Sequence, residues 1–204
     1  ETLKKLNITE DFLEDYLTKE FNYPVFLNID VLDYNERVDE KNSNFLDFIN
    51  NNKKYKSSFM KFVSKTNIYF AGHFYASGAP YLFTREDVRS KQFNISVVAD
   101  ISCDIDGPVA TTIRASKITD PIYGYNKITE SEDNFMKDDV IAVMAVDNLP
   151  CELPKDSSND FGENLIKHII PILNSNDSIL EDATICKDGD LTKNFEYLRD
   201  YINS

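Results

Sequence analysis

The side chains best suited to chemistry lie in a short run of small and acidic residues, from Ser102 to Gly107. This run follows directly on an apolar segment, Val97 to Ile101. An apolar run without alternation is typical of a strand that is buried on both faces of a parallel sheet. Ligands in open α/β sheets bind just beyond the carboxyl ends of such strands. The run is therefore predicted to line a site, and these residues leave one alternative open, a buried strand that merely ends in an acidic turn.

A second apolar segment ends in the same way. Val140 to Val146 contains no polar residue, and it runs directly into the turn Asp147-Asn148-Leu149-Pro150. The segment therefore predicts a second buried strand that emerges into a polar turn. The repeated form strengthens the prediction of a site at strand ends.

Three carboxylates near the first turn, those of Asp100, Asp104 and Asp106, resemble the clustered ligands that hard cations take. Asp100 lies inside the predicted strand, however, and the three side chains would share one face only if the strand continued. Gly107 and Pro108 follow at once. We therefore predict no metal site here.

The histidines and cysteines indicate little acid–base or nucleophilic chemistry. His73 follows a glycine at a predicted strand end, a better position for function than that of His168 inside a long amphipathic helix. Cys103 and Cys151 lie in strand-end turns, but nothing nearby in sequence would lower a thiol pKa, which favours inert thiols. The sequence contains neither a glycine-rich phosphate loop nor the G-x-S-x-G elbow of α/β-hydrolases.

Composition indicates a globular protein. The chain has 204 residues, of which 42% are hydrophobic and 28% are charged. A net charge of −13 disfavours nucleic acid and anionic membranes as partners, because both bind basic surfaces. The three cysteines show no metal-type spacing, and no apolar run is long enough for a membrane span. We therefore expect a cytoplasmic protein without a disulfide framework.

The polar turns after residues 97–101 and 140–146 lie at one edge of a sheet if helices and strands alternate along the chain, because alternation gives parallel strands. Thr84 is expected to cap a short helical turn, and Ser157, with Asp160 three residues on, a long helix. The predicted helices span 1–7, 11–21, 44–62 in two pieces, 155–173 and 194–202. The predicted strands span 8–9, 25–29, 67–75, 97–101 and 140–146. Loops are predicted over 30–41 and 126–139. This order indicates an α/β fold with a mostly parallel, Rossmann-like sheet.

Several separate blocks form a recognisable pattern in a fixed order. They are Val98 to Gly107, Thr119-Asp120-Pro121, Val146 to Pro154, Ile68 to Asp87 and the helix at Asp160-Phe161-Gly162. Together they resemble the saccharopine dehydrogenase/lysine-ketoglutarate reductase family, which belongs with the alanine dehydrogenases and the nucleotide-binding subunit of transhydrogenase. The resemblance covers nearly the whole chain. It implies an NAD(P)-dependent oxidoreductase with two Rossmann-like domains and an active site in the cleft between them.

The resemblance also implies roles for individual residues. The expected catalytic residue is Asp104, which matches an aspartate close to the reacting centre of alanine dehydrogenases. The expected cofactor-binding residues are Gly72, His73, Ile101, Ser102, Cys103, Asp104, Val146, Asp147, Asn148 and Leu149. The expected substrate contacts are Phe74 and Tyr75, and no metal ligand is expected. Relatives usually carry another residue at the position of His73, which argues against His73 as a general base.

The implied reaction is hydride transfer between a nicotinamide and an amino acid or a saccharopine-like adduct, in lysine or other amino-acid metabolism. The expected cofactor is NAD, with NADP left open. An acid after the second strand, at Glu10 or Asp11, would favour NAD because it hydrogen-bonds a free 2′-hydroxyl and repels a 2′-phosphate. The expected partner is a small amino-acid or keto-acid substrate, and a homo-oligomer is left open.

Residues 1–105 are expected to form part of the nucleotide-binding domain, and residues 106–204 a segment that packs on the catalytic domain. Glu1 to Ile8 resembles the helix after the family's glycine-rich turn, so the chain is expected to begin past that turn and past the first strand. The family's lysine and histidine acid–base residues precede it, so the chain alone is expected to be inactive without that N-terminal half. The alternatives are a non-catalytic fragment or partner-binding subunit, and a free-standing small-molecule-binding domain.

Overall fold

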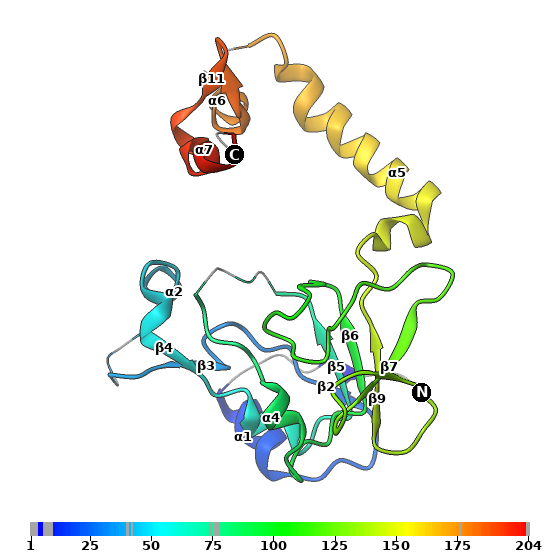
Figure 1. The fold of residues 1–204 in the computed structure, drawn as a ribbon. Helices are drawn as coiled ribbons and strands as arrows, with labels where there is room; N and C mark the ends of the chain where they lie inside the picture. Colours follow the sequence, from blue (N-terminus) through cyan, green and yellow to red (C-terminus); the bar gives the residue numbers. More distant parts are fainter. Residues whose placement is uncertain are drawn as a thin grey trace. The chain divides into compact units, whose positions relative to one another are not determined.

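The computed structural model describes residues 4–5, 10–39, 41, 43–73, 75, 78–175 and 177–202. Two compact units follow one another along the chain, which we call the sheet unit (Glu1–Leu149) and the C-terminal unit (Pro150–Ser204). Both are drawn in Figure 1. None of the described helices is long and apolar enough to cross a membrane.

A mixed five-stranded sheet lies at the centre of the sheet unit (Figure 1), in the order β5-β6-β9-β7-β8. β5, β6 and β9 are parallel to one another, whereas β7 and β8 pair in antiparallel fashion. The strands span Ile68–Ala71 (β5), Val97–Asp100 (β6), Ile122–Asn126 (β7), Glu132–Asp133 (β8) and Val140–Met144 (β9). The prediction of an α/β fold with a Rossmann-like sheet is confirmed.

The sheet takes strands from both sides of residue 105, where the sequence analysis divides the chain. The assignment of residues 1–105 to a nucleotide-binding domain and of 106–204 to a returning segment stays a prediction. The loop predicted over 126–139 is wrong at Glu132–Asp133, which pairs with Gly124 and Tyr125 of β7. A strand of two residues gives no periodic signal in the sequence, so only its pairing reveals it.

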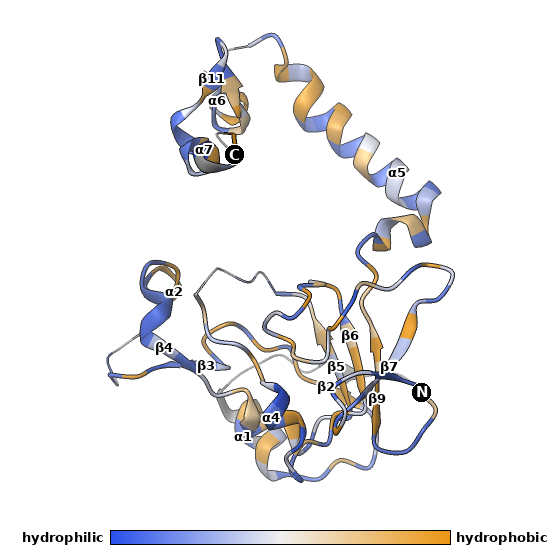
Figure 2. Ribbon diagram, in the orientation of Figure 1, coloured by the Kyte–Doolittle hydropathy of each residue, from blue (hydrophilic) through white to orange (hydrophobic). Residues whose placement is uncertain are grey.

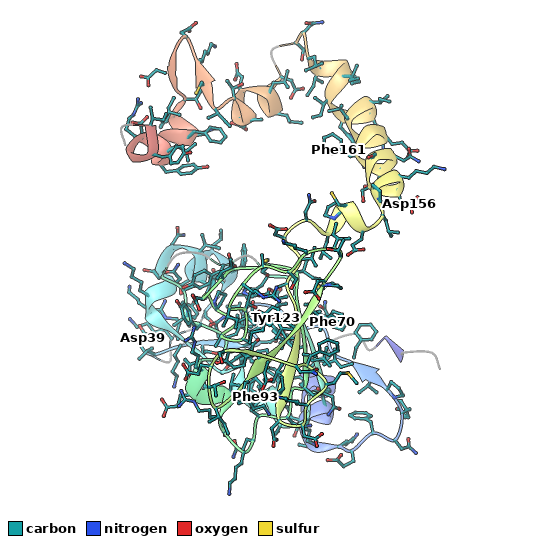
Figure 3. All side chains as sticks on the ribbon, turned by 45° about the vertical axis from the view of Figure 1, so that its right-hand side comes forward. Asp39, Phe70, Phe93, Tyr123, Asp156 and Phe161 are labelled. Atoms are coloured by element: carbon teal, nitrogen blue, oxygen red, sulfur yellow. The ribbon has the colours of Figure 1, made fainter. Side chains whose placement is uncertain are left out.

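The two faces of the sheet differ in exposure. Val98, Val143 and Tyr123 lie on one face and are at most 2% exposed. On the other face Phe70, beside Ala99 in the register, is 69% exposed. Figure 3 labels both Tyr123, inside the dense group of side chains, and Phe70. Figure 2 shows that β6 and β9 consist mainly of hydrophobic residues.

An aromatic cluster forms the core beneath the buried face. Phe59 is 1% exposed and lies at its centre. The rings of Tyr34, Phe62, Tyr69 and Phe83 surround it, with centroids 4.9 to 6.3 Å from the Phe59 ring. Such pairs add to the free energy of burial through favourable ring geometry. The cluster therefore ties β5 to segments before and after it in the sequence.

Short helices lie between successive strands in the first half of the sheet unit. The expected cap at Thr84 is present. The Thr84 side chain accepts a hydrogen bond from the N–H of Asp87, and the Asp87 carboxylate accepts one from the N–H of Thr84. The region 44–62, predicted as a helix in two pieces, does contain two helices, which a 3₁₀ turn at Asn52–Lys54 and a short strand separate. The helices of the sheet unit that the structure describes are α1 (Glu10–Thr18), α2 (Phe45–Asn51), α3 (Met60–Val63) and α4 (Arg85–Val88).

Two smaller sheets correct the predictions for the first third of the chain. β1 (Lys4–Lys5) pairs in parallel with β2 (Val25–Phe26), so the predicted helix over 1–7 is wrong at those two residues. β3 (Asn35–Arg37) pairs with β4 (Tyr55–Ser57), so the predicted loop over 30–41 is wrong there. Pairing between distant segments outweighs local polarity in both cases. The strand predicted at 8–9 lies outside the described residues.

The C-terminal unit contains the longest of the described helices, α5 (Pro154–Asn164), which continues through a π turn (Leu165–Ile169) and a 3₁₀ turn (Ile170–Ile172). The predicted cap at Ser157 is wrong, because the helix begins at Pro154, a residue suited to the first helical position. Phe161 on α5 is 69% exposed (Figure 3). The unit ends with α6 (Ser178–Ala183), a hairpin of β10 (Cys186–Lys187) and β11 (Asp190–Leu191), a 3₁₀ turn (Lys193–Leu198) and α7 (Arg199–Ile202).

Candidate functional site

The carboxyl ends of β5, β6 and β9 meet at one edge of the sheet, because the three strands are parallel. The backbone N–H groups of Ile101 and Ser102 donate to the carbonyl oxygen of Ala71, over 2.8 and 3.2 Å. The thiol of Cys103 donates to the carbonyl oxygen of Ala145 over 3.1 Å. The turn after β6 is therefore bonded to the chain at the ends of both neighbouring strands.

His73 joins this edge from the segment that follows β5. The Ser102 hydroxyl donates to the backbone oxygen of His73 over 2.7 Å and lies 3.5 Å from the ring Nδ1. The ring Nε2 is buried and has no hydrogen-bond partner. Burial lowers the pKa of His73, and the carboxylates of Asp100 and Asp104 only partly oppose this shift. Gly72, next to it, is exposed.

We predict that His73 makes the sheet unit less stable as pH falls below about 6.5. Because its pKa is lowered in the folded chain, the unfolded chain takes up a proton at a higher pH than the folded chain does. The free energy of unfolding should therefore fall between the ordinary histidine pKa of 6.5 and the lower folded value. Urea unfolding at pH 7.5 and 5.5 measures this, and His73→Gln should flatten the change. Equal pH dependence in both proteins would contradict the prediction.

Asp104 lies beyond this edge in a tight turn, where its backbone oxygen accepts from the N–H of Gly107 over 3.0 Å. Burial raises the pKa of the Cys103 thiol, and the carboxylates of Asp100, Asp147 and Asp104 raise it further. A thiol with a raised pKa stays mostly protonated and reacts slowly at neutral pH. The hydrogen bond from this thiol to Ala145 shows that the turn after β6 lies beside the end of β9.

A cavity of about 410 Å³ lies beside the end of β9. Its walls come from two segments and combine apolar groups with hydroxyl, amide, ammonium and carboxylate groups. They are Ala115, Ser116, Lys117, Ile118, Thr119, Val146, Asp147 and Asn148. Three of the four residues predicted after β9 therefore line it, whereas Leu149 begins a 3₁₀ turn (Leu149–Glu152) and is not among the lining residues. The predicted residues at 72–75 and 101–104 do not line it either.

The segment 115–119 is the part of the site that the sequence analysis did not identify. The N–H of Ser116 donates to the carbonyl oxygen of Ala145 over 2.7 Å, and Ser116 forms a parallel bridge with Val146. This pairing holds the segment along the end of β9. The sequence marks this segment only through Thr119-Asp120-Pro121, one of the blocks that resemble the dehydrogenase family. This block contains no chemical motif of its own.

Tyr75 approaches the first turn through Tyr81. The Tyr75 hydroxyl donates to the carbonyl oxygen of Ala79 over 3.1 Å, and its ring centroid lies 5.8 Å from that of Tyr81. The Tyr81 hydroxyl in turn donates to the backbone oxygen of Asp106 over 3.4 Å. Phe74, the other predicted substrate contact, lies outside the described residues. No three histidine, cysteine, aspartate or glutamate residues in the described part of the chain gather as metal ligands do.

Comparison with known proteins identifies a matching family and several curated relatives. Residues 26–197 match the family described as alanine dehydrogenase/PNT, C-terminal domain. Among curated proteins, the chain is 32% identical over 119 residues to an alpha-aminoadipic semialdehyde synthase of Arabidopsis thaliana, covering 55% of this chain and 11% of that protein. It is 22% identical over 175 residues to the mitochondrial alpha-aminoadipic semialdehyde synthase of Mus musculus, covering 72% of this chain and 19% of that protein. The chain thus spans between about a tenth and a fifth of the length of these relatives.

Proposed function

Because this chain belongs to the family of the alanine dehydrogenase/PNT C-terminal domain, we propose that it carries the nicotinamide-binding wall of an amino-acid dehydrogenase. The proposed reaction is hydride transfer between NAD, or NADP, and an amino acid or a saccharopine-like adduct. The names of the relatives place them in the formation of alpha-aminoadipic semialdehyde, which supports a role in lysine metabolism. The proposed partners are this small substrate, the N-terminal half that supplies acid–base residues, and a second copy in a homo-oligomer.

One observation carries the proposal: a cavity of about 410 Å³ opens beside the end of β9, one of three parallel strands whose carboxyl ends share an edge of the sheet. Its volume lies in the range of small-molecule sites, about 300 to 1,000 Å³. Asn148 offers an amide donor and acceptor suited to a carboxamide, and the Asp147 carboxylate accepts from ribose hydroxyls. Ile118 and Val146 supply apolar wall for a flat ring. When bound, the nicotinamide donates or accepts a hydride at its C4 atom.

The turn after β6 would border the reacting end of the same ligand. In this proposal Ile101, Ser102 and Cys103 form the backbone wall, with Gly72 and His73 beside them. Asp104 would be the residue nearest to the substrate, where its carboxylate orients an amino group. Tyr75 and Phe74 would then contact the substrate from the segment after β5.

Exchange of Asn148 for alanine tests this assignment. In the full-length protein, we expect Asn148→Ala to weaken NADH or NADPH binding about fivefold. This is the effect of losing one hydrogen bond worth about 1 kcal/mol. Titration followed by nicotinamide fluorescence measures the dissociation constant for both nucleotides and shows which one binds. Asn94→Ala is the matched control, because Asn94 is an exposed asparagine of the sheet unit that does not line the cavity.

Equal nucleotide affinity in Asn148→Ala, Asn94→Ala and the parent protein would exclude Asn148 from the site. Complete absence of NADH and NADPH binding in the parent protein would overturn the dehydrogenase proposal itself. It would favour the alternative of a non-catalytic, partner-binding subunit.

A further inference from the structure

A buried carboxylate lies directly beneath the turn that carries Cys103 and Asp104. Asp100 ends β6 and is 0% exposed. A carboxylate at such a position is costly unless hydrogen bonds satisfy both oxygens. Both are satisfied, because Oδ1 accepts from the N–H of Cys103 over 3.0 Å and Oδ2 accepts from the hydroxyl of Thr112 over 2.6 Å. The carboxylate therefore bridges the start of the turn to a segment beyond it.

Thr112 holds the other end of the same turn. Its side chain is also fully buried. Its hydroxyl binds Asp100, and its backbone oxygen accepts from the N–H of Asp106 over 2.9 Å. One residue thus fixes both the beginning and the end of the segment that carries Asp104.

The backbone of this turn needs such support. Cys103 and Asp106 both adopt positive φ angles, 54° and 51°, which residues other than glycine rarely occupy. A conformation of this kind persists only where the surrounding structure holds it. On the outer side Arg85 binds the Asp106 carboxylate over 2.6 Å, but that ion pair is exposed to solvent and contributes little. The buried contacts to Asp100 and Thr112 are therefore the stronger restraint.

We infer that Asp100 and Thr112 form a buried lock that positions the Cys103–Asp104 backbone for the ligand of the strand-end site. They are positioning residues, since they act through the turn. The role in ligand binding rests on the proposed function. The lock itself can be tested without any nucleotide, through the half-buried Cys103 thiol.

Thr112→Val removes the hydroxyl at nearly constant shape, and Thr112→Ser retains it. Both are made in a protein in which the exposed Cys151 and Cys186 are replaced by serine, so that Cys103 is the remaining thiol in this chain. We expect Thr112→Val to raise the rate of Cys103 modification by a disulfide reagent about tenfold and to weaken NADH binding by a similar factor. Thr112→Ser should restore both values. Asp100→Asn tests the same bond through NADH binding, which it should weaken as Thr112→Val does. Its thiol rate should rise for a second reason as well, because the Asp100 carboxylate itself raises the Cys103 pKa.

Thr111→Val is the matched control. Thr111 is equally buried, but its hydroxyl has no hydrogen-bond partner, so this substitution should change neither the thiol rate nor nucleotide binding. Circular dichroism well below the unfolding temperature confirms that each variant is folded. Parental thiol rates in folded Thr112→Val and Asp100→Asn would overturn the lock. If Thr112→Val raised the thiol rate but the parent protein bound no nucleotide, the lock would be supported and the proposed function overturned.

Discussion

Gly107→Ala is expected to weaken nicotinamide nucleotide binding at least tenfold. A Cβ atom at residue 107 would lie 2.7 Å from both the Cβ and the backbone oxygen of Asp104, closer than real Cβ atoms approach. Because one of these contacts is with backbone, the turn itself must shift, and with it the residue proposed to lie nearest the substrate. Overpacking of this kind also costs about 1 to 3 kcal/mol of stability. Fluorescence titration with NADH and urea unfolding measure the two effects.

Gly162→Ala makes the same chemical change where it meets no obstacle. A Cβ atom at Gly162, within α5, would meet nothing within 4 Å apart from its chain neighbours and the backbone of its own helix, and alanine is favoured over glycine inside a helix. This control should bind nucleotide as the parent protein does. If Gly107→Ala also bound normally, Asp104 would not depend on the turn geometry, and its proposed role beside the substrate would be wrong.

Phe59→Ala is expected to lower the free energy of unfolding of the sheet unit by about 4 kcal/mol, within the range measured for deletion of buried aromatic rings. The ring is 1% exposed and contacts four other aromatic rings. Its removal leaves a cavity that rigid neighbouring rings cannot fill. The loss is read from denaturant unfolding followed by near-ultraviolet circular dichroism.

Phe70→Ala is the comparison for this variant, because Phe70 lies in β5 of the same unit but is 69% exposed. Its loss should cost less than about 1 kcal/mol, as for most exposed positions. Similar losses in the two variants would mean that the aromatic cluster around Phe59 is not the core of the unit.

The central sheet and the edge that carries the candidate site were largely predictable, because long apolar runs are a local signal. β6 ends at Asp100 and β9 at Met144, within two residues of the ends predicted from the apolar runs. The short strands β3, β4 and β8 were not predictable, because two or three residues give no periodic signal and only their pairing with another strand reveals them. Ser157 was mistaken for a cap because Pro154 starts the helix earlier than a capping pattern indicates.

The sequence by itself determined that two apolar strands end in polar turns, and that a fold of this class brings such ends to one edge. It also carried the resemblance that the family match confirms. The tertiary structure alone decided that the segment 115–119 runs beside Val146 and lines an open cavity with it. It alone revealed that Asp100 reaches Thr112 beneath the turn. The physical reason is that the apolar strands β6 and β9 form where the local sequence is hydrophobic, whereas the path of a loop depends on hydrogen bonds to residues far along the chain.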